Sequence, residues 1–178
     1  AECGTTLVAL TFLVNGGVEA NEPGVLTTVK ASGEELASGV ASLCYDLPAM
    51  VAAGQLALDY VRVERSEIEE TGEYDLDGLF VRLNYAIDSI GARRVVLDTI
   101  ESLFSGLKDD ALLRAVLRRL FRWLLDKGVT AIITGASGAG LLTKQGLEED
   151  VAAPVIRPDH RGPDQDSTGL LRVDHATR

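Results

Sequence analysis

The sequence has few of the residues that characterise secreted, membrane-spanning or nucleic-acid-binding proteins. Its 178 residues include two cysteines, Cys3 and Cys44, which are too few for a disulfide framework, so reduced thiols are expected. No apolar run reaches the roughly 18 residues needed to span a bilayer, and no basic leader segment is evident. The 17 basic and 27 acidic residues give a net charge of −10, which disfavours binding to nucleic acid. These absences predict a cytoplasmic protein without membrane or nucleic-acid partners.

What remains is the composition of one globular α/β domain, 46% hydrophobic and 25% charged. Strand and helix patterns alternate along the chain. Buried apolar strands separated by helices predict a doubly wound, mostly parallel sheet with helices on both faces. The predicted strands span 24–30, 55–63, 93–100 and 129–135, and the predicted helices span 6–14, 33–44 (with Ser32 and Glu35 as a capping box), 76–91 and the segment 112–128.

The chain opens with AECGTTLVALTFLVNGG, in which a Gly/Thr segment precedes an apolar run. The run predicts a buried helix from Thr6, and we expect Asn15, Gly16 and Gly17 to end it. A short Gly/Thr loop before a helix is typical of phosphate-binding loops, because free N–H groups and the helix dipole favour an anion there. The alternative is an ordinary first helix, since the P-loop pattern has a lysine where Thr5 stands.

The segment LLRAVLRRLFRWLLDKG holds the one cluster of basic residues. Its spacing predicts an amphipathic helix whose arginine face is either solvated or a subunit contact. The polar side carries Arg114, Arg118, Arg119 and Arg122, and the residues expected to face inward are Leu113, Val116, Leu117, Leu120, Leu124 and Leu125.

Three segments are predicted to meet at the carboxyl ends of the parallel strands, where such sheets bind ligands. They are residues 1–6, the residues after Val29, and Asp98 with Thr99. The strand RRVVLD ending in Asp98 has the Walker B form, in which the carboxylate orients a magnesium-bound water. Any buried strand that ends in aspartate has the same form, so the pattern gains weight only beside the Gly-Thr-Thr helix start.

Long stretches of the chain resemble the KaiC-like branch of the RecA-type P-loop ATPases, the circadian-clock ATPase family. The resemblance covers residues 1 to about 149 of a single domain 1–178. It implies a RecA-like core, ATP and Mg²⁺ bound between subunits, ring-shaped hexamers, and a strand before the P-loop that this sequence lacks. Residues 150–178 are expected to form an irregular tail with weak strand signals at 151–156 and 170–173. The stretches that carry the family resemblance are FLVNGGVEANEPGV, YDLPAMVAAGQL, RSEIEETGEYDLDGLFVRLNYAIDSIGARRVVLDTIESLFSG, LRRLFRWLLDKGVTAIITG and LTKQGLEE.

The chain departs from the family pattern at the positions that carry chemistry. The family resembles G-x-x-G-x-G-K-T at the opening, where this chain keeps Gly4 and Thr6 but has Thr5 for the lysine and Glu2 for a glycine. The family's two glutamates, which activate the attacking water, are replaced by Lys30 and Ala31. Two further departures are Ala136–Ser137 where the family has Glu-Arg, and His175 and Arg178 as remnants of its Lys-x-Arg-Gly segment.

The resemblance therefore implies nucleotide binding by Gly4, Thr5 and Thr6 and metal binding by Thr6 and Asp98, with no catalytic residue in place. Lys30 is the one candidate for a substitute cation. Its alternative is a solvated lysine that pairs with Glu34 or Glu2.

Three hypotheses follow from these departures. The first is a KaiC-like domain with weak or no turnover, a pseudoenzyme with an assembly or regulatory role. The second is an active ATPase or autokinase in which other residues supply the missing groups. The third is a truncated or altered chain that keeps only the fold. We expect homo-oligomers weaker than the family's rings, although the arginine face could meet acidic residues such as Glu67, Glu69 and Glu70.

Overall fold

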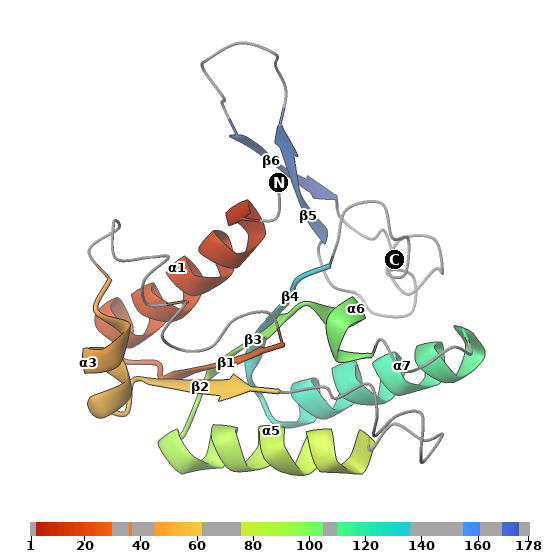
Figure 1. The fold of residues 1–178 in the computed structure, drawn as a ribbon, viewed down its shortest axis with the longest axis horizontal. Helices are drawn as coiled ribbons and strands as arrows, with labels where there is room; N and C mark the ends of the chain where they lie inside the picture. The colour runs from red at the N-terminus through yellow and green to blue at the C-terminus, as the bar shows by residue number, and fades with distance from the viewer. Residues whose placement is uncertain are drawn as a thin grey trace.

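The structure is a computed structural model, and it describes residues 3–29, 36, 45–61, 76–104, 110–135, 155–160 and 169–174. Within these residues a four-stranded, all-parallel sheet with the order β2-β1-β3-β4 has helices on both faces (Figure 1). This confirms the predicted α/β class. The elements are α1 (Cys3–Glu19), β1 (Gly24–Thr28), α3 (Leu47–Ala52), β2 (Leu56–Tyr60), α5 (Leu76–Ile90), β3 (Arg94–Asp98), α6 (Ile100–Leu103), α7 (Asp110–Asp126), β4 (Thr130–Ile133), β5 (Val155–His160) and β6 (Gly169–Asp174).

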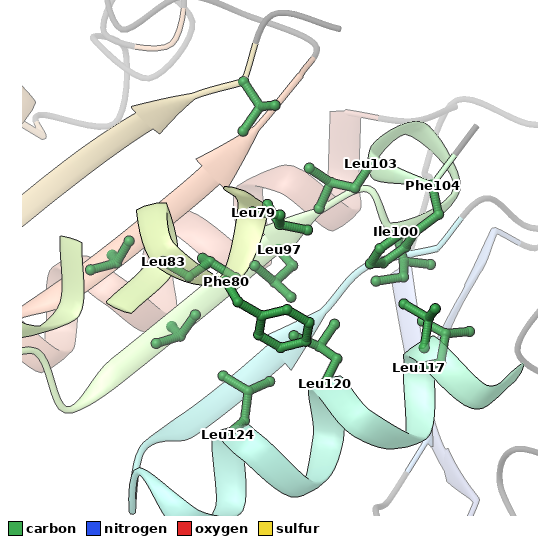
Figure 2. Packing of buried hydrophobic residues seen from close by; sticks show 14 of the residues in the cluster. Leu79, Phe80, Leu83, Leu97, Ile100, Leu103, Phe104, Leu117, Leu120 and Leu124 are labelled. Carbon is green, nitrogen blue, oxygen red and sulfur yellow. The ribbon is translucent and has the colours of Figure 1, made fainter. Parts of the chain in front are cut away.

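The sheet separates two apolar cores, because successive side chains of a strand point to opposite faces. One core lies between the sheet and α5, α6 and α7 (Figure 2). It includes Phe80, whose ring packs edge to face against that of Trp123 with the ring centroids 5.6 Å apart. The other lies under α1 and α3. Its buried members are Ala9, Leu10, Leu13, Val14, Leu26, Leu36, Leu47, Met50, Leu56 and Val96.

Strand register brings the carboxyl ends of the inner strands together. Thr28 of β1 is the register partner of Asp98 of β3, and β3 in turn pairs with β4 up to Ile133. The predicted strand 93–100 is shorter than expected, because it ends at Asp98 and Ile100 begins α6. The edge formed by these strand ends is where the candidate site lies.

Helix α1 extends beyond its predicted end and runs to Glu19. Asn15, Gly16 and Gly17 were expected to end it, and that prediction is wrong. The two glycines instead allow close packing: a Cβ on Gly16 would collide with the Arg94 side chain, and one on Gly17 would lie 2.9 Å from Met50 Cε. Their lack of a side chain lets α1 lie against the sheet and α3.

Arg94 fastens α1 to the start of β3. Its guanidinium contacts Glu22 through Nε and Nη2, each 2.8 Å from Oε2, and donates to the carbonyl oxygen of Phe12 over 2.8 Å. The guanidinium carbon also lies 4.7 Å from the centroid of the Phe12 ring. These contacts use the planar fork of arginine, and lysine cannot reproduce them.

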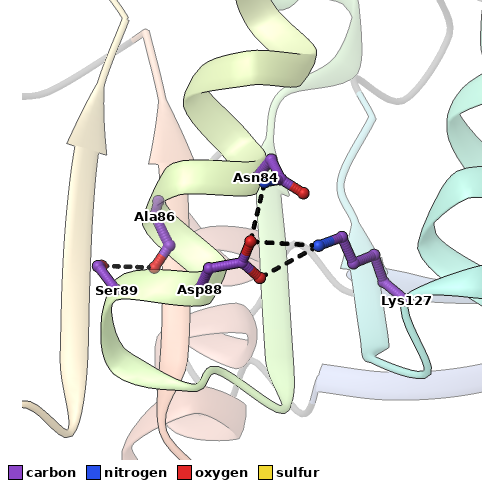
Figure 3. A network of polar contacts seen from close by, with 5 residues as sticks. All are labelled: Asn84, Ala86, Asp88, Ser89 and Lys127. Atoms are coloured by element: carbon purple, nitrogen blue, oxygen red, sulfur yellow. Dashed lines mark hydrogen bonds and ion pairs between the residues drawn. The ribbon is translucent and has the colours of Figure 1, made fainter.

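The helices on the other face end largely as predicted. Gly91 follows α5 and Gly128 follows α7, with φ of +62° and +67°, a conformation that favours glycine. The two helix ends are joined by Lys127, whose Nζ lies 3.1 Å from Asp88 Oδ1, and Asp88 also accepts from Asn84 (Figure 3). Leu125 was expected to face inward, but it is 72% exposed because it lies on the outer side of α7.

The arginine face of α7 is partly engaged within the chain. Arg119 pairs with Asp77 of α5 over 3.0 Å, and its guanidinium lies 4.8 Å from the centroid of the Phe80 ring. Arg114 and Arg118 also take part in polar or ring contacts. Arg119 therefore helps to hold α7 beside α5.

Some of the remaining sequence predictions agree with the structure, and others differ from it or lie outside the described residues. The predicted helix 33–44 lies outside the described residues except for Leu36, as do Glu67, Glu69 and Glu70. Helix α3, capped by the Asp46 carboxylate 2.9 Å from the Ala49 N–H, was not predicted. The weak strand signal at 170–173 falls within β6, and that at 151–156 overlaps β5 only at Val155 and Ile156. The two strands form an antiparallel pair. Among the described residues, no helix has both the length and the apolarity to cross a membrane.

Two buried oxygen atoms have no hydrogen-bonding partner among the described residues. They are Thr27 Oγ1 and Asp59 Oδ2, and Thr27 and Asp59 are register partners on neighbouring strands. The other oxygen of Asp59 accepts from Arg82 Nη2 over 2.6 Å. Both residues lie on the α5 face, away from α1.

We expect the Arg94→Lys variant to be less stable than the parent by about 1–2 kcal/mol, because it loses the bond to the Phe12 carbonyl and the two-nitrogen contact with Glu22. Arg93→Lys is the matched control, since it is the same substitution at the adjacent residue, whose side chain is exposed. Urea unfolding followed by circular dichroism gives both values. Equal stability of the two variants would show that Arg94 does not hold α1 to the sheet.

Candidate functional site

The first turn of α1 and the last residue of β3 meet at the carboxyl edge of the sheet. The Thr6 hydroxyl donates to Asp98 Oδ2 over 2.8 Å, although the two residues are 92 positions apart in sequence. Helix α1 runs over β1 and β3, which directs its N-terminal end toward this edge (Figure 1). The structure thus brings together the two residues that the sequence analysis assigned to a metal.

Asp98 is deeply buried, with only 1% of its surface exposed. Its second oxygen, Oδ1, accepts from the Thr134 hydroxyl over 2.5 Å. Among the described residues, the partners recorded for this carboxylate are hydroxyl groups and no cation. A buried carboxylate normally carries a charged partner, since desolvation is otherwise costly. The described part of the chain thus supplies Asp98 with hydrogen bonds but with no charged partner.

Thr134 was not among the predicted site residues. It follows β4, the last strand of the parallel sheet, and its own backbone N–H donates to the Leu97 carbonyl over 3.0 Å. The available signal was position: Thr134 ends an apolar strand just as Asp98 does. Only the pairing of β3 with β4 shows that the two residues are neighbours.

The oxygen atoms of this cluster fit a magnesium ion better than a softer metal. A threonine hydroxyl and an aspartate carboxylate are hard oxygen ligands of the kind that Mg²⁺ prefers, and Mg²⁺ usually keeps several waters beside one or two protein ligands. No group of three or more His, Cys, Asp or Glu residues suited to a metal occurs within the described ranges. In type, the oxygen atoms of Thr6 and Asp98 fit a Mg²⁺ ion that keeps most of its water ligands.

Other residues of the predicted site are placed only in part. Gly4 and Thr5 lie in the first turn of α1, next to Thr6. Lys30 and Ala31 follow the described part of β1 and lie outside the described residues, as do Ala136, Ser137, His175 and Arg178.

This fold and site define a class of protein: an ATPase domain with the RecA-like P-loop fold, in which a helix start faces a strand-end aspartate. The sequence matches the family described as "ATPase: KaiC" over residues 1–176. The chain belongs to the KaiC ATPase family.

Individual relatives agree with this placement. The chain is 52% identical over 173 residues to circadian clock protein KaiC2 of Synechocystis, covering 97% of this chain and 30% of that protein. It is 32% identical to the circadian clock oscillator protein KaiC of Synechococcus elongatus, over 86% of this chain and 30% of that protein. The crystal structure of a KaiC-like protein from the archaeon Pyrococcus horikoshii matches with a TM-score of 0.78 and 27% identity, over 97% of this chain and 74% of that one.

The chain spans about 30% of the length of the curated relatives it matches.

We expect Asp98→Asn to be at least as stable as the parent in buffer containing EDTA, because the partners of the buried Asp98 carboxylate among the described residues are hydroxyl groups. Asp59→Asn is the matched control. Its carboxylate pairs with Arg82, and its loss should lower the free energy of unfolding by about 0.5–1 kcal/mol. Thermal and urea unfolding of both variants test this. A large loss of stability in Asp98→Asn would show that the Asp98 charge is compensated.

Proposed function

We propose that this domain binds Mg²⁺-ATP weakly and hydrolyses it slowly or not at all, acting as a pseudo-ATPase in assembly or regulation. The observation that carries the proposal is the 2.8 Å bond between Thr6 and Asp98. It supports a preserved metal site in a chain whose sequence lacks the P-loop lysine. Bound Mg²⁺ would supply charge neutralisation at the phosphates, with Thr6 and Asp98 holding it.

The weakness of binding and turnover follows from charge. Phosphoryl transfer depends on positioning and on cationic groups around the phosphates, and single such groups contribute orders of magnitude in rate. Thr5 offers a neutral hydroxyl where the family resemblance places an ammonium. Lys30 and Ala31 offer no carboxylate to orient the attacking water. The preserved hydroxyl and carboxylate can hold a metal but cannot replace these groups.

An assembly or regulatory role is favoured by the contrast between the site and the scaffold. Both core clusters are filled with apolar side chains, and Arg94 joins α1 to the start of β3. A scaffold preserved around a weakened site suits a domain that responds to nucleotide without consuming it rapidly.

Calorimetry with ATP, in Mg²⁺ and in EDTA, tests the proposal directly. We expect the parent to bind weakly and only with Mg²⁺, and Asp98→Ala to abolish that binding. Thr5→Lys should raise affinity by on the order of tenfold or more, because a charge-assisted bond to phosphate replaces a neutral contact. Asn15→Lys is the matched control, since it adds the same charge to an exposed position at the far end of α1.

Three further results bear on the same proposal. ATP turnover by the parent at rates typical of active P-loop ATPases, abolished by Asp98→Ala, would contradict it. Absence of binding by both the parent and Thr5→Lys would leave a chain with the fold alone. Loss of the residual binding in Lys30→Ala would identify Lys30 as the replacing cation, whereas an unchanged affinity would make it a solvated lysine.

We also expect self-association to be weaker than the hexameric rings that the family resemblance implies. If nucleotide joins neighbouring subunits, a weakened site loses much of that contact, and rim charges such as Arg122 affect register more than affinity. Sedimentation velocity at micromolar concentration, with and without Mg²⁺-ATP, measures this. A stable hexamer without nucleotide would disprove the expectation.

A further inference from the structure

The carboxylate of Asp98 has two oxygens with different partners from different elements. Oδ2 faces Thr6 of α1 over 2.8 Å, and Oδ1 faces Thr134, which follows β4, over 2.5 Å. Thr134 is itself buried, with 7% of its surface exposed. Each oxygen of the carboxylate therefore accepts a hydrogen bond from a separate hydroxyl group.

The direction of these bonds follows from the chemistry of the groups. An ionised carboxylate only accepts hydrogen bonds, so both threonine hydroxyls must donate. The Thr134 hydroxyl also lies 3.4 Å from the Leu97 carbonyl oxygen, but its single proton goes to the nearer, charged acceptor. The Thr134 hydroxyl is consequently committed to Asp98.

The backbone of Thr134 makes hydrogen bonds to residues that precede and follow Asp98 in the sequence. Its N–H donates to the carbonyl of Leu97, and its carbonyl accepts from the N–H of Ile100, each over 3.0 Å. Residues 97 and 100 flank Asp98 in sequence, so Thr134 cannot shift without breaking contacts with the same stretch of chain. Its hydroxyl is thus a fixed point against which the carboxylate is oriented.

We infer that Thr134 is a positioning residue for the metal site: by holding Oδ1, it directs Oδ2 of Asp98 at Thr6. A carboxylate left free turns easily about its last side-chain bond, which has a broad, roughly two-fold preference. Fixing it in advance removes that freedom before a metal binds. The part of the inference that concerns the metal rests on the proposed function; the part that concerns the orientation of Asp98 does not.

Crystal structures of metal-free variants test the orientation. In Thr134→Val, which keeps the shape and removes the hydroxyl, we expect the Asp98 carboxylate to turn away from Thr6 or to occupy two conformers. Thr134→Ser should keep the orientation of the parent. An unchanged bond between Thr6 and Asp98 in Thr134→Val would overturn the inference.

Mn²⁺ binding in the presence of ATP, followed by electron paramagnetic resonance, tests the consequence for the metal. Loss of a residue that orients a ligand typically costs about 10–100-fold in metal affinity. We therefore expect Thr134→Val to bind Mn²⁺ on the order of tenfold more weakly and Thr134→Ser to bind like the parent. Affinity in Thr134→Val equal to that of the parent would overturn the role toward the metal.

Thr27→Val is the matched control. Thr27 is a fully buried strand threonine whose hydroxyl has no partner among the described residues, so its loss should change neither the Asp98 orientation nor Mn²⁺ affinity. If Thr134→Val does not fold, Thr134→Ala gives the same readouts. A parent that shows no Asp98-dependent Mn²⁺ binding would remove the metal site of the proposed function, and the crystal structures would still decide the orientation.

Discussion

The seating of α1 on the sheet is the constraint on which the rest of the structure depends. Gly16 and Gly17 remove side chains where the helix meets Arg94 and Met50, and Arg94 then reaches across to the Phe12 carbonyl. A helix held this closely at its C-terminal half has little freedom at its N-terminal half. That restriction carries Thr6 to Asp98, so the geometry of the site is set by contacts made at the opposite end of the helix.

The same arrangement explains how a carboxylate persists at the strand end in the absence of a lysine at position 5. Thr6 and Thr134 donate one hydrogen bond to each oxygen of Asp98, which offsets part of the cost of burying it. Hydroxyl groups satisfy the geometry of a carboxylate but leave its charge unbalanced. Within the described residues the carboxylate therefore lacks a charged partner, which a bound cation would supply.

Sequence patterns were sufficient for the features that depend on long periodic segments. The parallel sheet, α5 with its Gly91 end, and Asp98 at the carboxyl end of an interior strand all follow from apolar spacing and strand alternation. The patterns failed where tertiary contact decides the outcome. Gly16 and Gly17 resemble a helix end unless the position of Arg94 is known, and Thr134 is an ordinary strand-end residue until register places it beside Asp98.

The unsatisfied pair Thr27 and Asp59 has a consequence for the dynamics of the sheet. Backbone pairing between β1 and β2 lies beside two buried oxygens that have no partner among the described residues, and such oxygens gain hydrogen bonds when water reaches them. The pair faces α5, whereas Thr6 and Asp98 meet on the α1 face. Opening of the outer strand β2 would therefore let water reach these oxygens on the face of the sheet opposite to Thr6 and Asp98.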